Sequence, residues 1–293
     1  MSLENIKATM HEKETYPFLM NFVPDSVLRK CEIELNETQE NKLKGLEELK
    51  KMLTMEKLTN GIVYKDDYLT RYLRHSKYNV TRAFERLRKG HIYRKKYSNL
   101  FKSLPDIWFS SKTSTKLMRV LPKRCQDGCT IIVFRYVLLL PDEMALTEIK
   151  RMFVITFDQL LRDPMTQING LKVIQDFRDA PLKLLRNCTP HNMYWFKHSG
   201  LDCFPGRFKE IHVLNESIVF KAAWVLLNRF LSEKIRKRIF FHSDPEELLD
   251  YFPRSVLPPE YGGCLEDTST DDWIRKANKY FEQFKTEGQC NFY

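Results

Sequence analysis

The stretch that decides the fold runs from Phe204 to Gly263. It begins with FPGRFKEIHVLNES (204–217), continues with IVFKAAWVLLNRFLSEKIRKRI (218–239) and ends with FFHSDPEELLDYFPRSVLPPEYGG (240–263). The first segment predicts a strand. The second predicts an amphipathic helix, because its apolar residues recur at three- and four-residue spacings over about four turns. The residues of this apolar face are Phe220, Ala223, Trp224, Leu227, Leu231 and Ile235.

Two pairs of cations flank this predicted helix. Lys234 and Arg238 are one helical turn apart near its end, and Arg207 and Lys209 lie two residues apart before the strand. Because i and i+4 on a helix point the same way, as do i and i+2 on a strand, each pair presents two positive tips to one side. The spacing leaves two interpretations open. The pairs are either unrelated and solvated, or they converge on a polyanionic ligand such as a phosphorylated inositol.

Helical spacing dominates the chain before residue 105. Residues 1–30 lack sustained periodicity and predict a loosely attached arm, whereas residues 31–105 predict a compact helical domain. Asn36 and Gln39 have the spacing of a capping box, which places the start of the first helix at Asn36. Further helices are predicted to start at Asp66 and Thr81. The apolar residues expected on the buried faces are Leu43, Leu46, Leu49, Leu53, Leu69, Tyr72, Leu73, Phe84 and Leu87.

The spacing becomes strand-like after residue 105. Three runs rich in β-branched residues predict strands, and two helical segments separate them. Strands separated by helices imply crossover connections and a mostly parallel sheet. We therefore predict an α/β domain over residues 106–266 and a tail over residues 267–293. The predicted strands are Thr130–Val137, Leu171–Phe177 and Glu210–Asn215, and the helices between them are Ile149–Asp163 and Pro190–Asp202.

Composition narrows the class of partner. The net charge of +10 favours anionic surfaces, either acidic lipid headgroups or nucleic acid. No zinc-finger spacing and no RNP-like aromatic strand accompanies that charge, so we expect a membrane surface and no nucleic acid. Seven scattered cysteines are typical of reduced thiols in the cytoplasm. The sequence has no signal-peptide core, and its longest apolar run is interrupted by Arg135, so we predict neither secretion nor a membrane span.

Motifs for catalysis and metal binding are weak. GxSxG, GxxxxGK[ST], GxGxxG and HExxH are absent. Cys129 and Arg135 have the spacing of a phosphatase loop, but the residues between them are strand formers without glycine, which do not easily turn their amides toward a phosphate. Cys125 and Cys129 flank an Asp-Gly turn, and His212 lies in a predicted strand, where a hydrogen-bonded buried histidine is expected. We therefore predict no catalytic residue and no metal site.

Five motifs in order make the chain resemble the CRAL-TRIO lipid-binding family, closest to its cellular retinaldehyde-binding protein and α-tocopherol transfer protein branch. The resemblance runs from roughly Leu35 to Gly263. It implies an α/β fold with a small N-terminal helical domain and a mostly parallel β-sheet floored by helices, which enclose a hydrophobic cavity under a mobile lid helix. The motifs are DDYLTRYLRHSKYNVTRAFERL (66–87), NGLKVIQD (169–176), FPGRFKEIHVLN (204–215), the helix 218–239 and LPPEYGG (257–263).

The resemblance also implies two sites. A basic cleft beside the lid binds phosphoinositide phosphates in the tocopherol-transfer branch, and its positions match Arg207, Lys209, Lys234 and Arg238. The cavity wall falls at Phe153, Val154, Phe157, Leu171, Gln175, Phe196, Ala223, Leu227 and Leu231. Gln175 is the polar member of the wall. We expect its amide either to contact a hydroxyl, aldehyde or ester of the cargo, or to be satisfied by a neighbouring backbone group.

The function that the resemblance implies is transport without catalysis. We expect a cytoplasmic, monomeric carrier of one small hydrophobic lipid, such as a retinoid or a tocopherol-like or other isoprenoid, which contacts phosphoinositide-bearing membranes transiently and releases its cargo there. No cofactor is expected besides the bound lipid. The alternatives are transfer of a phospholipid of the phosphatidylinositol type and a lipid-sensing regulatory module. Asn228-Arg229-Phe230 occupies the place of the proline common in the family's lid, and Phe157 replaces a smaller polar residue of the tocopherol binder, so tocopherol itself is not the predicted cargo.

Overall fold

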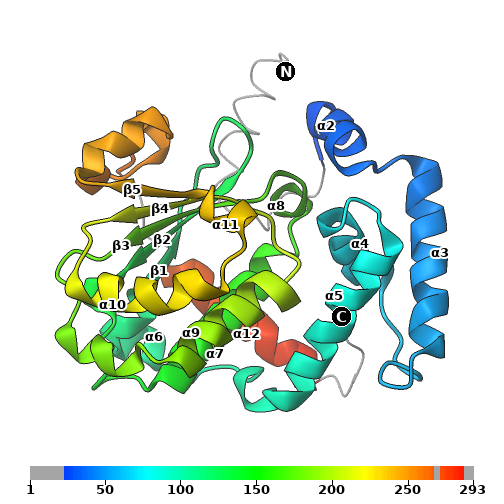
Figure 1. Cartoon of the computed structure of the whole chain (residues 1–293), viewed down its shortest axis with the longest axis horizontal. Coiled ribbons are helices and arrows are strands. Elements are labelled where there is room, and N and C mark those ends of the chain that lie inside the picture. Colours follow the sequence, from blue (N-terminus) through cyan, green and yellow to red (C-terminus); the bar gives the residue numbers. More distant parts are fainter. Residues whose placement is uncertain (1–22, 267–270, 287–293) are drawn as a thin grey trace, which may run out of the picture.

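The computed structural model describes residues 23–266 and 271–286, and its helices fall into two groups (Figure 1). The first group forms a unit at one end of the molecule, and the second surrounds a sheet. The first group comprises α2 (Asp25–Leu35), α3 (Gln39–Met55), α4 (Asp66–His75) and α5 (Val80–Lys96). The second comprises α6 (Trp108–Ser111), α7 (Leu146–Leu160), α8 (Pro164–Asn169), α9 (Pro190–Lys197), α10 (Ile218–Leu227), α11 (Glu233–Arg236) and α12 (Asp271–Thr286).

The N-terminal helices begin and end at different residues from those predicted. The N-cap of α3 is Thr38, whose hydroxyl accepts a hydrogen bond from the Asn41 amide at 3.1 Å, and not Asn36. Asn36 has a left-handed conformation and ends α2, a helix that runs across the predicted boundary at residue 30. Asparagine suits both the start and the end of a helix, so its spacing alone was ambiguous. Leu43 is 61% exposed, whereas the other predicted apolar residues are buried.

Helices α3, α4 and α5 pack around one apolar cluster that includes Leu49, Leu73 and Leu87. α4 begins at Asp66 as predicted, and α5 begins one residue before Thr81 because the Asn79 side chain caps it. α2 packs separately, through Cys31 and Leu35, against Ile168 of α8. The N-terminal helices therefore contact the second group of helices at α8.

Five strands form one sheet in the order β1-β2-β3-β4-β5. β1 is antiparallel to β2 and the other neighbours are parallel, which confirms the predicted α/β class. The three predicted strands correspond to β2, β3 and β4. The edge strands β1 and β5 were missed because so few residues show no clear period, and β5 begins at the last residue of the predicted lid helix. The bounds are β1 (Met118–Val120), β2 (Thr130–Arg135), β3 (Leu171–Asp176), β4 (Phe208–Leu214) and β5 (Ile239–His242).

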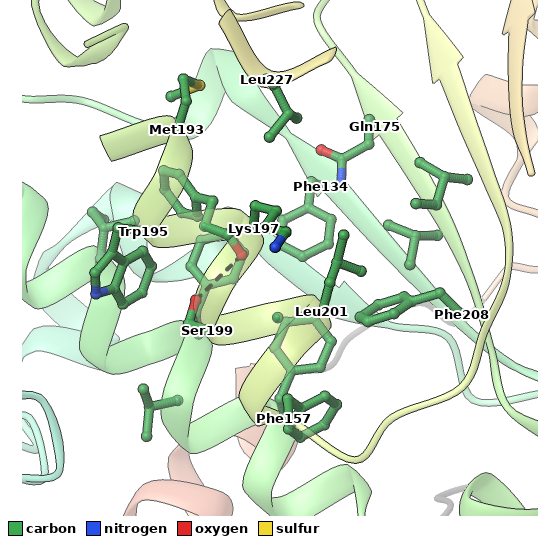
Figure 2. Close-up of a pocket in the computed structure, with 18 of the residues that line it drawn as sticks. Phe134, Phe157, Gln175, Met193, Trp195, Lys197, Ser199, Leu201, Phe208 and Leu227 are labelled. Carbon is green, nitrogen blue, oxygen red and sulfur yellow. Dashed lines mark hydrogen bonds between the residues drawn. The ribbon is translucent and has the colours of Figure 1, made fainter. Parts of the chain in front are cut away.

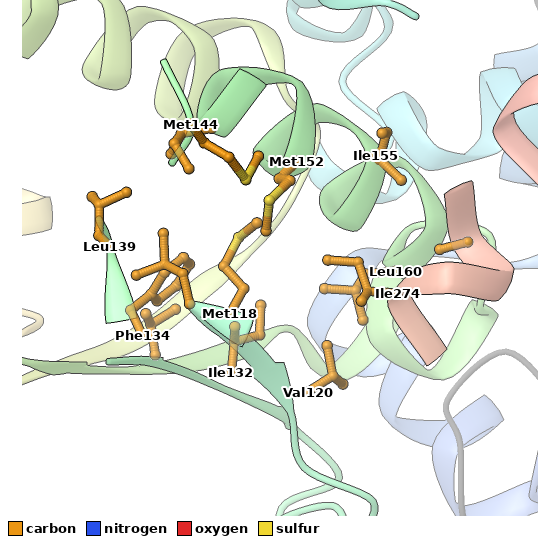
Figure 3. Packing of buried hydrophobic residues seen from close by; sticks show 14 of the residues in the cluster. Met118, Val120, Ile132, Phe134, Leu139, Met144, Met152, Ile155, Leu160 and Ile274 are labelled. Atoms are coloured by element: carbon orange, nitrogen blue, oxygen red, sulfur yellow. The ribbon is translucent and has the colours of Figure 1, made fainter. Parts of the chain in front are cut away.

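Alternate strand residues pack on opposite faces of the sheet. On one face Ile131 and Val133 contact the segment that follows β5, through Leu248 and Phe252 among others. The other face is covered by α7, α9, α10 and α12 (Figure 1). Part of the space beneath these helices is hollow (Figure 2), and part is filled by interlocking side chains such as Met118 and Met152 (Figure 3).

Two arginines of the N-terminal helices hold the segments that lead into the strands. Arg86 Nη1 of α5 donates to the carbonyl oxygens of Leu201 and Phe204, at 2.7 and 2.9 Å. Arg74 Nη1 of α4 donates to Gln167 Oε1 of α8 at 2.7 Å. The helical unit thus fixes the backbone just before β3 and β4.

Gly170 sets the close approach of β3 to β4. Its φ is +96°, and a Cβ atom there would lie 2.4 Å from the Arg207 carbonyl oxygen. That same oxygen accepts a hydrogen bond from the Leu171 amide at 2.8 Å. A side chain at residue 170 would therefore displace the start of β4, the segment that carries Arg207 and Lys209.

Candidate functional site

A cavity of about 370 Å³ lies between the sheet and helices α7, α9 and α10 (Figure 2). Its wall is mainly aromatic and aliphatic. Phe153 stacks on Phe134 with ring centroids 5.2 Å apart, and Phe157 meets Phe204 edge to face at 5.1 Å. An apolar molecule in this space is favoured by about 25 cal/mol for each Å² removed from water. The predicted wall residues that line the cavity are Phe153, Val154, Phe157, Gln175, Phe196, Ala223, Leu227 and Leu231.

Leu171 was also predicted to line the cavity, and it does not. It lies on the same face of β3 as Val173 and Gln175, but at the first position of the strand. There Phe208 of β4 pairs with it in register, and the Leu171 side chain is fully buried in the packed core. Period-two spacing assigns a face to each strand residue but does not show how far along the strand the cavity extends.

Gln175 and Tyr136 place polar groups in the part of the cavity wall that the sheet forms. The Tyr136 hydroxyl donates to Gln175 Oε1 at 2.7 Å. Burial raises the pKa of the Tyr136 phenol well above its usual value, so this donor stays neutral. Among the described residues, nothing accepts a hydrogen bond from the Gln175 amide nitrogen, which points into the cavity in Figure 2. The partner of the amide oxygen is therefore a side chain and not a backbone group, the second of the two alternatives above, and the amide donors remain available to a cargo.

The predicted lid helix 218–239 is not continuous. α10 ends at Leu227, a 3-10 turn covers Asn228–Phe230, Leu231 is extended, and α11 begins at Glu233. The Arg236 guanidinium donates to the Leu231 carbonyl oxygen at 2.9 Å, which satisfies a backbone acceptor freed by the break. The chain therefore bends at the place where the family commonly has proline, without a proline.

Three of the four predicted cations, Arg207, Lys209 and Arg238, lie at the start of β4. Arg207 Nη2 and Lys209 Nζ lie 3.5 and 3.4 Å from the same carboxylate oxygen, Glu34 Oε2 of α2. Arg238 Nη1 donates to the carbonyl oxygen of Phe208, the residue between Arg207 and Lys209. Lys234 is exposed on α11. These four cations, which we call the basic cleft, are Arg207, Lys209, Lys234 and Arg238.

Glu34 is the carboxylate of this cleft. Burial acts to raise the pKa of the Glu34 carboxyl, but Lys209, Lys30 and Arg207 outweigh burial, and the pKa is lowered. Glu34 is therefore ionised at neutral pH. It partly neutralises the cleft from a helix distant in sequence, which the spacing of the cations did not predict.

His75 interacts electrostatically with two of the four cations. Burial and the nearby cations Arg86, Arg207 and Lys234 lower the pKa of the His75 imidazole to about 3, and a backbone hydrogen bond to Pro205 opposes them. The half-buried ring is therefore neutral at physiological pH. Arg207 and Lys234 are thus both among the charges that keep this ring neutral.

Comparison with known proteins assigns the fold to a family. The sequence pattern of the CRAL/TRIO domain matches residues 115–263, just over half of the chain. The chain belongs to the CRAL/TRIO family. Members bind small hydrophobic ligands, and the matched residues span the whole sheet and most of the wall of the cavity. The chain is therefore a lipid-binding protein of the transfer class.

Relatives extend the similarity beyond the CRAL/TRIO domain. The α-tocopherol transfer protein-like protein of Homo sapiens is 30% identical over 250 residues, which cover 85% of this chain and 73% of that protein. Clavesin-2 of Mus musculus is 29% identical over 252 residues, covering 85% and 77%. Among solved structures, the crystal structure of Sfh5 covers 86% of this chain and 99% of that chain, with 13% identity and a TM-score of 0.49.

Cys129 and Arg135, which have the spacing of a phosphatase loop, do not form a phosphate-binding loop, because the residues between them form strand β2. Cys129 precedes β2, and its thiol is buried and donates to the Asn169 carbonyl oxygen at 3.3 Å. Burial, with Asp127 nearby, raises the pKa of the Cys129 thiol well above its usual value, which disfavours the thiolate that a nucleophile requires. Arg135 is the last residue of the same strand.

His212 is fully buried and hydrogen-bonded, as predicted. Its Nδ1 lies 2.9 Å from His242 Nε2, and its Nε2 lies 3.2 Å from Glu210 Oε2. Within residues 23–266 and 271–286 no three His, Cys, Asp or Glu side chains are grouped so as to hold a metal ion. Over the same ranges, no helix has both the length and the apolar character required to cross a bilayer.

Sequence reasoning missed Tyr136, Glu34 and His75. Tyr136 carried a usable signal, because it follows a buried strand and ligands in open α/β sheets bind beyond the carboxyl ends of the strands. Glu34 and His75 carried none. They come near the cations because α2 and α4 both pack on α8, the helix that leads into β3.

Proposed function

We propose that this protein carries one small hydrophobic molecule in its cavity and releases it at phosphoinositide-bearing membranes. The observation that carries the proposal is the position of the segment α10–α11. Ala223, Leu227 and Leu231 of this segment line the cavity, and Lys234 and Arg238 at its end belong to the basic cleft. One segment therefore carries both residues that line the cavity and residues of the proposed headgroup site. We further propose that the carrier works as a cytoplasmic monomer that meets membranes transiently.

The chemistry of the wall restricts the cargo. The amide nitrogen of Gln175 offers hydrogen-bond donors inside an otherwise apolar region, and leaving them unpaired beside a bound molecule costs about 1–3 kcal/mol. A cargo with an acceptor oxygen, as in a hydroxyl, an aldehyde or an ester, satisfies them. Retinoids and tocopherol-like or other isoprenoids carry such an oxygen on an apolar body. The name of the α-tocopherol transfer protein-like relative is consistent with this class.

The basic cleft suits a multiply phosphorylated headgroup. Arg207, Lys209, Lys234 and Arg238 supply cations, and a single carboxylate, Glu34, faces two of them. Release then follows from a shift in population. A headgroup that binds the cleft more tightly when α10–α11 is displaced favours the open form by that difference in affinity.

A charge-reversal variant tests the membrane step. We expect Lys234→Glu/Arg238→Glu to lower transfer of a fluorescent lipid to phosphoinositide vesicles at least about tenfold, because each removed phosphate contact weakens a charge-assisted bond. The cargo should stay bound in the absence of vesicles. Transfer is measured by energy transfer from the bound lipid to an acceptor in the vesicle.

The matched control is Lys44→Glu/Lys51→Glu, which changes net charge equally on exposed positions of α3. If both double variants transfer lipid at the wild-type rate, the cleft has no part in release. Organic extraction of the purified protein and mass spectrometry then identify the cargo. Recovery of a phospholipid would replace the isoprenoid proposal by phospholipid transfer.

A further inference from the structure

The cavity continues beyond Phe157, between α7 and the N-terminal helices. Its wall there includes Tyr68, Arg71 and Tyr72 of α4 and Asp158 of α7. This end of the cavity brings a guanidinium, a carboxylate and two phenol groups together. The Tyr68 and Tyr72 hydroxyl oxygens are 3.0 Å apart.

Arg71 is buried and poorly paired. Its side chain is 9% exposed, and its guanidinium makes no hydrogen bond to any residue of the described ranges. The Nε atom is fully buried without a partner. The nearest carboxylate oxygen, Asp158 Oδ1, lies 3.9 Å from Nη1, which is too long for a hydrogen bond. A guanidinium carries five N–H donors, so most of its bonding capacity is unused.

Arg74 provides an internal comparison, since it lies on the same helix and is buried to a similar degree. Its guanidinium donates three hydrogen bonds of 2.7 Å, two to Glu37 and one to Gln167. The fold therefore gives one of these two arginines three short hydrogen bonds to its own side chains. It leaves the one that lines the cavity without such bonds.

The carboxylate nearest to Arg71 is also shared with a second arginine. Asp158 accepts a hydrogen bond from Arg162 Nη2 at 3.3 Å, so one carboxylate faces two guanidinium groups. Burial lowers the pKa of Arg71 and Asp158 opposes that effect, but arginine remains charged in proteins. A buried cation without a full partner is costly, and an anion in the cavity would remove that cost.

We propose that Arg71, with the hydroxyls of Tyr68 and Tyr72, binds the oxyanion head of an anionic lipid whose tail lies in the aromatic part of the cavity. The head is a carboxylate or a phosphate, which share the acceptor geometry that a guanidinium matches. The inference rests on the proposed carrier function and narrows its cargo to molecules with an acidic end. Gln175 then contacts an acceptor oxygen on the other part of the cargo.

Paired ligands on the wild-type protein test this inference without any variant. Palmitic acid is compared with hexadecanol, and lysophosphatidic acid with monoacylglycerol, by displacement of a fluorescent lipid. We expect the acid to bind at least tenfold more tightly than its neutral counterpart in one of the two pairs, which is about 1.4 kcal/mol. The pair that shows the preference distinguishes carboxylate from phosphate. Equal affinities within both pairs would overturn the inference and leave the carrier function intact.

Variants locate the preference at Arg71. Arg71→Gln should reduce the acid-to-alcohol ratio to near one while hexadecanol still binds. Asp158→Asn removes the competing carboxylate and should maintain or increase the ratio. Arg88→Gln is the control, because Arg88 pairs with Glu56 on the same helical unit and does not line the cavity. A ratio that survives Arg71→Gln would contradict the assignment, and a protein that binds none of the lipids would contradict the carrier function as well.

Discussion

Single residues decide how strongly the basic cleft attracts a headgroup. The Glu34 carboxylate faces Arg207 and Lys209, so it competes with the phosphates of a bound headgroup for these two cations. We expect Glu34→Gln to strengthen binding to phosphoinositide vesicles about threefold to tenfold, because partly exposed ion pairs contribute up to about 1 kcal/mol each. Vesicle co-sedimentation measures the change. Glu32→Gln, an exposed neighbour on α2, controls for net charge, and an equal gain in both variants would contradict a specific role for Glu34.

His75 gives the protein a pH-dependent stability. In the unfolded chain this imidazole takes up a proton near pH 6.5, whereas in the folded protein it does so only near pH 3. Acid therefore favours the unfolded form, and the stability present above pH 6.5 is lost as pH falls toward 3. At pH 5 the loss reaches about 2 kcal/mol. Urea unfolding of wild type and His75→Gln between pH 7.5 and 5 should show a steeper decline for wild type, and parallel curves would contradict the prediction.

At the scale of elements, the break between α10 and α11 borders the cavity, and in the function we propose it helps to keep the cargo enclosed. Leu231 is 5% exposed. Its backbone is extended between the two helices, and its side chain lines the cavity. We expect Leu231→Ala to speed cargo release at least about tenfold, because truncation of a buried leucine costs about 2–5 kcal/mol and here weakens the closed position. Stopped-flow transfer to vesicles without phosphoinositide measures the rate.

Val225→Ala on α10 is the control for that experiment. Val225 is 59% exposed, so its truncation removes little buried area on the same helix. Release rates that match in the two variants would indicate that Leu231 does not hold the segment closed. A faster rate in Leu231→Ala alone would show that the residue at the break, and not a residue along α10, keeps the cargo enclosed.

At the scale of the whole molecule, Arg74 links the helical unit to the sheet domain. Arg74 bonds both Glu37, which precedes α3, and Gln167 of α8. Arg74→Met would leave the Glu37 carboxylate buried without its partner, so we expect about 3–5 kcal/mol of lost stability. Denaturation followed by circular dichroism and by tryptophan fluorescence should still give coincident transitions, because the two parts share a core contact through α2 and α8.

Arg88→Met is the control variant for Arg74→Met. Arg88 and Glu56 form a more exposed pair within the helical unit, and we expect its loss to cost less than about 1 kcal/mol. A loss in Arg74→Met no larger than that in Arg88→Met would show that the contact between the two parts does not depend on Arg74.

Periodic features were predictable because they depend on near neighbours. Alternation in β2, β3 and β4 and the three- to four-residue spacing in α3, α4 and α5 reflect which side chains must be buried, and burial follows the period of each element. The sequence therefore determined the α/β class, the helical unit, the family and eight of the residues that line the cavity. The continuous lid helix was predicted by the same rule and was wrong, because apolar spacing persists across the 3-10 turn Asn228–Phe230 where the backbone does not.

Tertiary structure alone decided which polar groups meet. Tyr136 reaches Gln175, Glu34 reaches Arg207 and Lys209, and Arg71 is left facing the cavity. Each contact joins residues far apart in the chain, or depends on where the packed core stops and the hollow begins. Hydrogen bonds and ion pairs act over a few ångströms and require defined orientations, whereas spacing in one sequence specifies only the face on which a side chain lies.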